Sequence, residues 1–262
     1  MDLGLNGKCA LVTGGSMGIG KAAALELATE GCRVAIAARG EAALAQAARE
    51  IGERTRAEVL AVRADCTKPE DVRRMVEEVV ARFGRLDILV NSIGAAKSGD
   101  FLTLPEDAWR ESLELKLYGV VRCCREALPH MRRQRWGRIV NLIGHRAGQP
   151  ESRAMPAGVA NAGLVNFTKA LADEYVKDGV LANGVSPCPM ETRRLDYMVQ
   201  AKAALEGISE DEAREAYLRD IPIGRFARPE EIAPLIAFLA SERNTYISGT
   251  TIAIDGGATR GI

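Results

Sequence analysis

The chain has 262 residues, 47% of them apolar, and its 35 basic and 35 acidic side chains give a formal net charge of zero. This length permits a large core, and the balanced charge argues against nucleic acid as the main partner. Residues 1–4 lack a basic region followed by a long apolar stretch, and no later run is long enough to span a bilayer, so we expect a soluble, cytoplasmic protein without a membrane partner.

Short apolar runs alternate with helical patterns along the whole chain. The runs expected to be strands are residues 10–12, 34–37, 59–62, 88–90, 139–142, 181–185 and 251–254. Unalternating apolar runs of this length are typical of strands covered on both faces, as in a parallel sheet. Strands and helices in strict turn predict one α/β domain over residues 1–262, a Rossmann-type, doubly wound parallel sheet of seven strands between two helical layers.

The clearest helical pattern lies between the third and fourth expected strands. Apolar side chains repeat there at helical spacing after Pro69 and form one face, made of Val72, Val76, Val79, Val80 and Phe83. Thr67 and Glu70 have the spacing of a capping box, which predicts the start of this helix.

Residues 190–221 depart from the alternation, because helical, charged sequence lies there between two strands. In a doubly wound sheet an insertion at this place overhangs the carboxyl ends of the strands, where ligands bind. We therefore expect a substrate lid at about 190–221. No motif in it identifies the substrate.

Cysteine and histidine usage argues against a metal centre. The six cysteines show no Cys-x-x-Cys spacing, and only two histidines are present. We expect buried thiols, no disulfide framework and no metal site.

A glycine-rich turn follows the first strand and opens a helix, and it reads Thr13-Gly14-Gly15-Ser16-Met17-Gly18-Ile19-Gly20. Glycines at these positions let the backbone turn tightly and approach a pyrophosphate, while the helix N-terminus offers free N–H groups. The residues expected to contact a dinucleotide are Gly14, Ser16, Met17, Gly18, Ile19 and Gly20.

With these motifs the chain resembles the short-chain dehydrogenase/reductase family over essentially its whole length. The shared features are the TGxxxGxG spacing, Asn91-Ser92-Ile93-Gly94 after the fourth strand, Pro222-Ile223-Gly224-Arg225-Phe226 with Pro229-Glu230-Glu231-Ile232-Ala233, and the ending Ile254-Asp255-Gly256-Gly257. The resemblance implies a nicotinamide dinucleotide as cofactor. It also implies a homo-oligomer, a dimer or tetramer, paired through helices at about 107–133 and 158–177.

The resemblance also assigns cofactor-binding residues outside the glycine turn. It places Asp65 at the adenine, Asn91 beside the adenosine ribose, and Thr192 at the nicotinamide amide or the phosphates. The full set that it implies is Asp65, Cys66, Asn91, Ile93, Gly94, Asn161, Pro187 and Thr192.

The end of the second strand bears on the choice of dinucleotide. Ala38 and Arg39 stand where members of the family that prefer NAD place an acid. Because an arginine fork suits a 2′-phosphate, NADP is expected in preference to NAD. The alternative for Arg39 is a surface charge at the strand end. Cys188 stands where the family usually has glycine, and its side chain would crowd the nicotinamide end.

The family's catalytic residues are missing from the positions that the resemblance gives them. In the family a Tyr exchanges the substrate proton, a Lys four residues later lowers its pKa, a Ser polarises the carbonyl, and an Asn completes a relay. This chain has Ala157 at the Tyr, Asn161 at the Lys, Gly144 at the Ser and Lys116 at the Asn. The sequence has no Tyr between 118 and 175, so a shifted alignment restores nothing.

Some side chains indicate replacement of this machinery. Lys116 and Asn161 look exchanged, so an ammonium could reach the nicotinamide ribose from the other helix. His145 follows Gly144 at the catalytic rim and could act as general acid or base. The alternative for His145 is a loop imidazole bonded to backbone. The candidate catalytic residues are therefore His145, Lys116 and Asn161.

Four arginines near these positions are open to two interpretations. Arg146, Arg153, Arg193 and Arg194 could line the cleft and favour an anionic substrate, or they could be solvated loop charges.

Three functions stay open for the chain. The first is an NADP-linked oxidoreductase acting on a carbonyl or secondary alcohol, with His145 or a water assisted by Lys116 as proton donor. The second is a lyase, isomerase or dehydratase on the same scaffold, and the third is a nucleotide-binding protein without turnover. The retained glycine turn favours the first.

Overall fold

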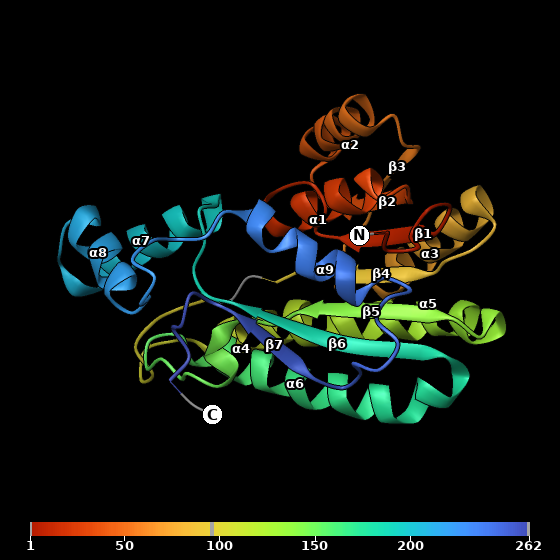
Figure 1. Cartoon of the computed structure of the whole chain (residues 1–262). Coiled ribbons are helices and arrows are strands. Elements are labelled where there is room, and N and C mark those ends of the chain that lie inside the picture. The colour runs from red at the N-terminus through yellow and green to blue at the C-terminus, as the bar shows by residue number, and fades with distance from the viewer. Residues whose placement is uncertain (1, 95–96, 261–262) are drawn as a thin grey trace.

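The computed structural model describes residues 2–94 and 97–260, in which the strands form one seven-stranded parallel sheet (Figure 1). The strand order is β3-β2-β1-β4-β5-β6-β7. The strands are β1 (Cys9–Thr13), β2 (Arg33–Ala38), β3 (Val59–Arg63), β4 (Ile88–Asn91), β5 (Gly137–Leu142), β6 (Val180–Pro187) and β7 (Thr251–Ile254). Each expected strand is confirmed to within two residues at either end, and with it the Rossmann-type fold.

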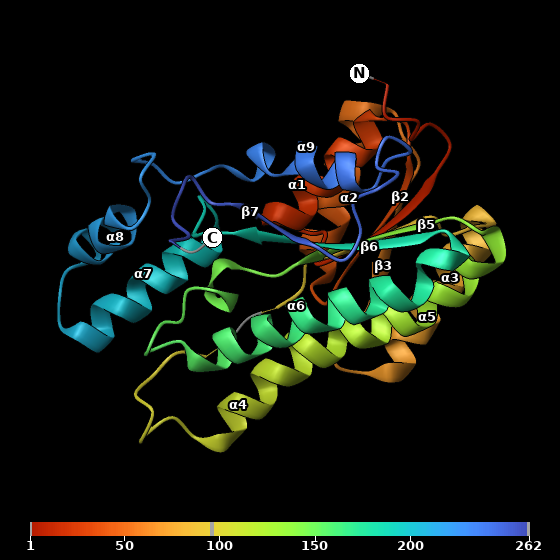
Figure 2. The ribbon, with the colours of Figure 1, turned by 60° about the horizontal axis from the view of Figure 1, so that its bottom comes forward.

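Helices cover both faces of the sheet, as Figure 2 shows nearly edge-on. The α-helices are α1 (Gly18–Thr29), α2 (Glu41–Thr55), α3 (Pro69–Phe83), α4 (Glu106–Leu113), α5 (Gly119–Gln134), α6 (Met155–Tyr175), α7 (Arg193–Glu206), α8 (Glu210–Arg219) and α9 (Ala233–Leu239). A π-helical turn, η1 (Glu114–Tyr118), joins α4 to α5, and short 3₁₀ turns lie at η2 (His145–Ala147), η3 (Val176–Asp178) and η4 (Pro229–Glu231).

An apolar core lies on each face of the sheet, between the sheet and the helices that cover it. One packs α3, α5 and α6 against one face of the sheet, and the other packs α1, α2 and α9 against the opposite face. The central strands β1, β4 and β5 are completely buried, as expected for a sheet covered on both sides, whereas the edge strands β3 and β7 are mostly half-buried or exposed.

The strand order reverses between β1 and β4, which pair in register from Ala10 with Ile88 to Thr13 with Asn91. Chain segments leaving these two strands diverge to opposite faces, so a crevice forms outside their carboxyl ends. The glycine turn and residues 92–94 therefore lie next to each other at the place where such folds bind ligands.

The helix α3 starts and ends where the sequence predicts, but its capping box is wrong. The hydroxyl of Thr67 donates to Oδ1 of Asp65 at 2.8 Å, and the N-cap is Lys68, which makes no side-chain cap. The start is set by Pro69, whose fixed φ and missing N–H suit the first helical position.

The segment 190–221 folds as the helical pair α7 and α8, which extends past the carboxyl ends of the strands (Figure 1). The pair has its own small core, made of Cys188, Leu195, Val199, Ala203, Ala213, Ile221 and Phe226. A capping box between Ser209 and Glu212 starts α8, a signal that the sequence analysis did not use.

The six cysteines are all free and buried, as expected. Over residues 2–94 and 97–260, no group of His, Cys, Asp and Glu is placed to hold a metal ion. No helix in the same ranges combines the length and apolarity that crossing a bilayer requires.

Candidate active site

The glycine turn after β1 is held against the chain that leaves β4. Gly14 has φ of 69°, and a Cβ there would lie 2.3 Å from the Ser92 carbonyl oxygen. Gly18 has φ of 54° and faces the methyl group of Thr192, which would lie 3.5 Å from a Cβ on Gly18. A side chain at position 14 would close this approach, and the positive φ of Gly18 favours glycine there, so these two residues keep the N-terminus of α1 open.

Thr192, predicted to contact the nicotinamide amide or the phosphates, lies against Gly18 of the glycine turn and is the N-cap of α7. The remaining predicted side chains of the turn are half-buried at Ser16 and Ile19 and 49% exposed at Met17. The turn thus has a backbone surface and one apolar side chain facing outward.

The adenine end of the predicted site lies at the ends of β2 and β3. Arg39 is exposed directly after β2, and no described residue forms an ion pair with it. Asp65 follows β3, and its Oδ1 accepts hydrogen bonds from the Thr67 backbone N–H and hydroxyl, which fixes the carboxylate. Cys66 is buried with its Sγ 3.8 Å from Sγ of Cys123 in α5.

Asn91 is completely buried, and its side chain ties the sheet together. Its Oδ1 accepts from the Thr13 hydroxyl at 3.3 Å, and its Nδ2 donates to Asn141 Oδ1 at 2.9 Å. Asn141 in turn donates to Thr168 of α6 at 2.9 Å. Because the side-chain amide of Asn91 already bonds within this network, Asn91 can contact a nucleotide only through its backbone. Ile93 and Gly94, which follow it, offer further contacts.

Lys116 projects from the π-helical turn η1 to the carboxyl ends of β4 and β5. Its Nζ donates to the carbonyl oxygen of Leu142 at 2.6 Å and to that of Ile93 at 3.2 Å. Gly94 makes room for it, since a Cβ there would lie 2.3 Å from Cδ of Lys116. Burial, with a smaller contribution from the positive charge of Arg194, lowers the pKa of Lys116 to about 8.

Asn161 reaches the same end of β5 from α6. Gly144 has φ of 122°, and a Cβ there would lie 3.0 Å from Nδ2 of Asn161. The Oδ1 of Asn161 is buried and has no hydrogen-bond partner among the described residues. Ala157, one helical turn earlier, is half-buried. Lys116 and Asn161, the two exchanged residues, thus both lie near the carboxyl end of β5, one at Leu142 and the other at Gly144.

His145 is the first residue of the 3₁₀ turn η2. Its imidazole hydrogen-bonds the backbone of Pro187, which can only offer its carbonyl oxygen. Burial lowers the pKa of His145, and the charge of Arg146 adds to that effect. A neutral ring bonded to backbone matches the second of the two interpretations that the sequence left open.

The four arginines have different surroundings. Arg146 is only 9% exposed and forms an ion pair with Glu151, so it is no solvated loop charge. Arg153 is exposed and pairs with Asp100 at 2.7 Å, and Arg193 is also exposed. Arg194 is half-buried, with its guanidinium 5.6 Å from the ring centre of Tyr197.

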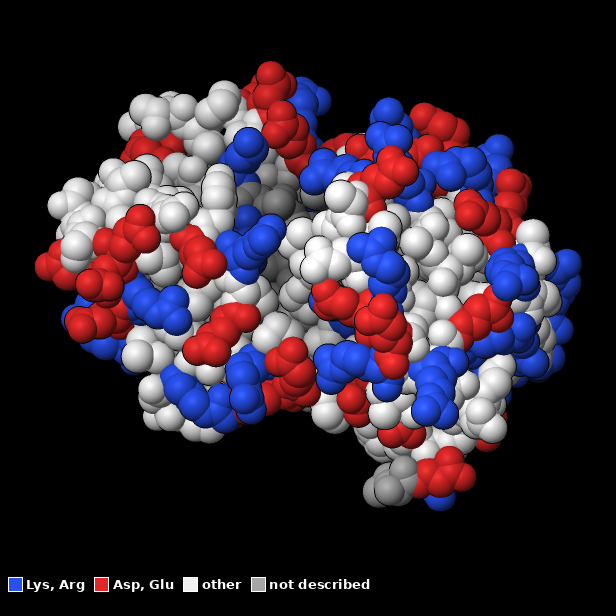
Figure 3. All heavy atoms as spheres, turned by 90° about the horizontal axis from the view of Figure 1, so that it is seen from above, with Lys and Arg blue, Asp and Glu red and all other residues white. Residues whose placement is uncertain are grey.

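Arg146 and Arg194 line a hollow between the α7–α8 pair and the segment after β5. Figure 3, which looks at the molecule from above in the orientation of Figure 1, shows a hollow between two parts of the surface, with Lys and Arg side chains at its border. Glu151, Tyr197 and Tyr217 also line the hollow between the α7–α8 pair and the segment after β5, and none of the three was predicted from the sequence. They come from segments without a recognisable motif, so no local signal pointed to them.

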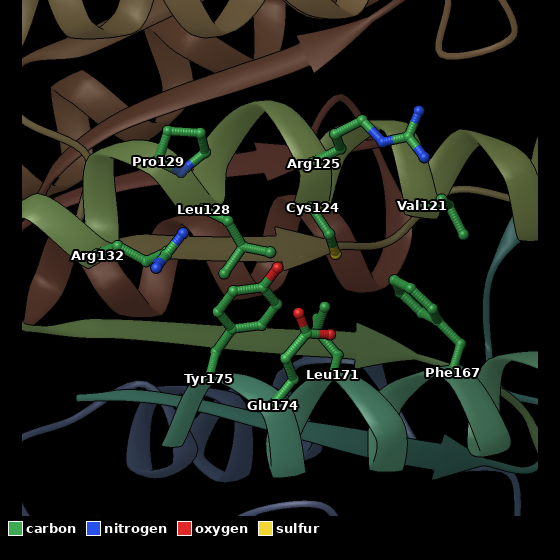
Figure 4. Close-up of a pocket in the computed structure, with 10 residues that line it drawn as sticks. All are labelled: Val121, Cys124, Arg125, Leu128, Pro129, Arg132, Phe167, Leu171, Glu174 and Tyr175. Atoms are coloured by element: carbon green, nitrogen blue, oxygen red, sulfur yellow. The ribbon is translucent and has the colours of Figure 1, made fainter. Parts of the chain in front are cut away.

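A second hollow, of about 240 Å³, lies between α5 and α6, away from the crevice. Figure 4 shows its apolar side chains pointing toward one another from the two helices. Its apolar lining is Val121, Cys124, Leu128, Pro129, Phe167, Leu171 and Tyr175. These are the helices that the family resemblance assigns to subunit pairing.

Comparison with known proteins supports one family. A family profile described as "Enoyl-(Acyl carrier protein) reductase" matches residues 14–259. The 3-oxoacyl-(acyl-carrier-protein) reductase of Staphylococcus aureus strain Mu50 is 35% identical over 252 residues, covering 95% of this chain and 97% of that protein. The enzyme of the same name from Vibrio cholerae serotype O1 is 35% identical over 261 residues, covering 97% and 98%.

Solved structures with the same fold contain a nicotinamide dinucleotide. L-sorbose reductase from Gluconobacter frateurii, complexed with NADPH and L-sorbose, superposes with a TM-score of 0.91 at 36% identity over 100% of both chains. A variant of actinorhodin polyketide ketoreductase with NADPH has a TM-score of 0.93 at 30% identity, covering 97% of this chain and 98% of that one.

Proposed function

The chain belongs to the short-chain dehydrogenase/reductase family, and from that membership we propose that it is an NADP(H)-dependent oxidoreductase with an atypical active site, in which Lys116 replaces the missing tyrosine as proton donor. The substrate is a carbonyl compound, reduced to a secondary alcohol. The observation that carries the proposal is the Lys116 ammonium at the carboxyl ends of β4 and β5.

The residues of the crevice fit a dinucleotide. The glycine turn leaves a cradle that a Cβ on Gly14 would fill, and the Oδ1 of Asn161 is a buried acceptor without a partner in the described part of the chain. An unsatisfied buried acceptor costs about 1–3 kcal/mol, so a ribose hydroxyl donating to Asn161 would stabilise the complex. The N-terminus of α1 would hold the pyrophosphate, Asp65 the adenine and Thr192 the nicotinamide end.

The form of the dinucleotide depends on Arg39. Its exposed guanidinium after β2 carries the positive charge that a 2′-phosphate requires, and no described carboxylate neutralises it. The NADPH complexes of two relatives agree with this preference. We therefore place NADP(H) ahead of NAD(H).

Proton supply is the task that this chain has to solve without the family's tyrosine. Bound NADPH would supply a hydride to the carbonyl carbon. The Lys116 ammonium would donate a proton to the carbonyl oxygen, and its pKa of about 8 keeps it protonated at neutral pH yet acidic enough to act. Two backbone carbonyls, of Leu142 and Ile93, orient the ammonium. His145, neutral and bonded to Pro187, would position the chain after β5 rather than exchange protons.

The surroundings of the site complete the proposal. The α7–α8 pair within 190–221 would cover the substrate, as part of the single domain 1–262. The apolar hollow between α5 and α6 supports a homo-oligomer through these helices. We propose a cytoplasmic location, where NADPH would be available to the enzyme.

The test is to titrate NADPH through its fluorescence and then to follow its absorbance with a panel of ketones. We expect saturable binding and a reduction rate that falls as the pH rises through about 8, because Lys116 then loses its proton. Binding without hydride transfer would favour a non-redox enzyme or a nucleotide-binding protein. A reduction rate without a transition near pH 8 would remove Lys116 from the reaction.

A further inference from the structure

The side-chain amide of Asn161 is buried at the carboxyl end of β5 without a protein partner among the described residues. Asn161 is only 6% exposed, and its Oδ1 is a buried acceptor that receives no hydrogen bond there. Within residues 2–94 and 97–260, no acceptor takes a hydrogen bond from its Nδ2 either. Buried amides in proteins are normally bonded, and an unpaired one is costly. Such an amide is suited to a ligand, because it contributes nothing to the fold through hydrogen bonding.

The backbone at Gly144 leaves the space that this amide uses. Gly144 has φ of 122° and ψ of 142°, a conformation that side chains rarely adopt. A Cβ there would lie 3.0 Å from Nδ2, 3.6 Å from Cγ and 3.7 Å from Oδ1 of Asn161. The amide group therefore lies against the face of Gly144 that carries no side chain, with Nδ2 nearest. At this point the chain leaves β5, at the edge of the sheet where folds of this type bind their ligands.

Lys116 has an N–H to spare at the same end of β5. An ammonium carries three N–H donors. Two of them bond the carbonyl oxygens of Leu142 at 2.6 Å and of Ile93 at 3.2 Å. In the described part of the chain these are the hydrogen bonds that the ammonium makes, so the third N–H is left for a ligand.

The two elements that carry these donors pack directly on each other. Lys116 lies in the turn η1 and Asn161 lies in α6. A Cβ on Gly163, two residues after Asn161, would lie 3.2 Å from Cδ2 of Leu117, the residue after Lys116. The glycine thus lets η1 approach α6 closely beside the two donors. Donors carried on packed helical elements keep their positions without help from a ligand, which is the condition for a preorganised site.

We propose that Nδ2 of Asn161 donates a hydrogen bond to the carbonyl oxygen of the substrate, while Oδ1 of the same amide accepts from the cofactor ribose. The inference rests on the proposed function. When the carbonyl carbon accepts the hydride, its π electron pair moves to the oxygen, and the oxygen takes the proton of Lys116, which leaves the alcohol and a neutral amine. A donor fixed where this negative charge develops stabilises the transition state more than the ground state. Asn161 is in this proposal a catalytic residue that also aligns substrate and cofactor.

Substitutions of Asn161 separate the two ends of the amide. Asn161→Asp keeps an acceptor for the ribose but has no donor when ionised. Its NADPH affinity should stay within a few-fold, while kcat for reduction of cyclohexanone or ethyl acetoacetate should fall about 10²- to 10³-fold, the loss expected for one such donor. Asn161→Leu removes both ends, so kcat should fall equally and NADPH should bind roughly 2- to 10-fold more weakly. Asn166→Leu, an exposed change on the same helix, is the control that should leave both quantities unchanged.

A spectroscopic test needs no turnover. The same two ketones, labelled with ¹³C at the keto carbon, are bound to the complex with NADP⁺, which has no hydride to give. A hydrogen bond to the carbonyl oxygen lowers the C=O stretching frequency. In isotope-difference infrared spectra, the band of the bound ketone should therefore lie at lower frequency in the wild-type protein and in Asn166→Leu than in Asn161→Leu. A residue with a purely structural role would not move this band.

The outcomes separate this inference from the proposed function. Wild-type kcat in Asn161→Leu, or the same carbonyl frequency in that variant and in the wild-type protein, would overturn the inference while the reductase proposal stands. A frequency shift that requires Asn161, without reduction of any ketone, would support the contact and overturn the reductase. Weaker NADPH binding by Asn161→Leu, with kcat preserved, would assign the amide to the cofactor alone and overturn the inference. Absence of any bound-ketone band in the wild-type protein would overturn both.

Discussion

The ammonium of Lys116 donates a hydrogen bond of 2.6 Å to the carbonyl oxygen of Leu142, the last residue of β5. This bond joins the helical run α4–η1–α5 to the strand whose continuation carries Gly144 and His145. A titratable cation is thereby placed at the rim where α/β folds of this type bind their ligands.

Replacing Lys116 should abolish reduction without preventing cofactor binding. Lys116→Met removes the proton source, and we expect kcat to fall about 10²- to 10⁴-fold, the usual contribution of general acid catalysis. Lys116→Arg is the matched control for charge, and its pKa is too high for proton transfer, so it should be equally slow. NADPH titration of both variants checks that the site is intact. Wild-type rates in Lys116→Arg would contradict the proton-transfer role.

The rates of carbonyl reduction and of alcohol oxidation should depend on pH in opposite ways. Carbonyl reduction needs the protonated Lys116 and should decline above pH of about 8, whereas oxidation of the alcohol needs the neutral amine and should rise through the same pH. Initial rates in both directions across this range provide the measurement. Parallel profiles would mean that another group exchanges the proton.

Arg39→Asp should reverse the dinucleotide preference. The carboxylate repels a 2′-phosphate and accepts hydrogen bonds from ribose hydroxyls, so the ratio of NADPH to NADH affinity should fall by roughly 10- to 100-fold. Arg49→Asp, an exposed change on α2, is the control that should leave the ratio unchanged. An unaltered ratio in Arg39→Asp would leave this arginine as a surface charge.

Restoring a serine at position 144 should destabilise the protein. Gly144 has φ of 122°, where side chains are strained, and a Cβ would press on Nδ2 of Asn161 at 3.0 Å. We expect Gly144→Ser to lower the free energy of unfolding by about 1–3 kcal/mol in urea denaturation. Gly148→Ser is the control, because Gly148 has φ of −110° and no other atom of residues 2–94 and 97–260 would contact a Cβ there within 4 Å.

The backbone strain at position 144 should also limit any attempt to rebuild the family's catalytic residues in this chain. The double variant with Ala157→Tyr and Asn161→Lys should bind NADPH. Adding Gly144→Ser to it should lower the free energy of unfolding by the amount expected for Gly144→Ser alone. A triple variant as stable as the wild-type protein would show that the chain after β5 adapts more easily than its glycine indicates.

Association through α5 and α6 can be tested at the apolar hollow of Figure 4. Phe167→Glu puts a charge into it, and the mass in solution should drop to that of the monomer. Ala170→Glu, exposed on the same helix and outside this lining, should leave the mass unchanged. Sedimentation measures both. An oligomer that survives Phe167→Glu must use another surface.

The sequence alone identified those parts of the molecule that local chemistry determines. Strands such as 139–142 follow from apolar runs, and the turn around Gly14 follows from backbone needs that only glycine meets. The capping box at Thr67 was wrong, because the helix begins one residue later than that box requires, with Lys68 as N-cap and Pro69 at the first helical position. The Thr67 hydroxyl donates to Asp65 instead of taking part in a cap.

The residues that meet at the candidate active site could be predicted only in part from the sequence. The exchange of Lys116 and Asn161 could be read from aligned positions, and the structure brings both to the end of β5. The Oδ1 of Asn161, which is unpaired among the described residues, could not be predicted from the sequence. Nor could the arginine hollow, since Glu151 and Tyr217 are far apart in sequence and come together only through packing.

The π-helical turn at 114–118 amounts to one surplus residue in an otherwise α-helical run. Removing a single residue from it would let α-helical hydrogen bonding resume and would rotate the preceding side chains by about 100° around the axis. Lys116 would then swing off the strand ends, although no amino acid of the pocket had been substituted. The chemistry of this protein would in that case be lost by a deletion that leaves its core composition untouched.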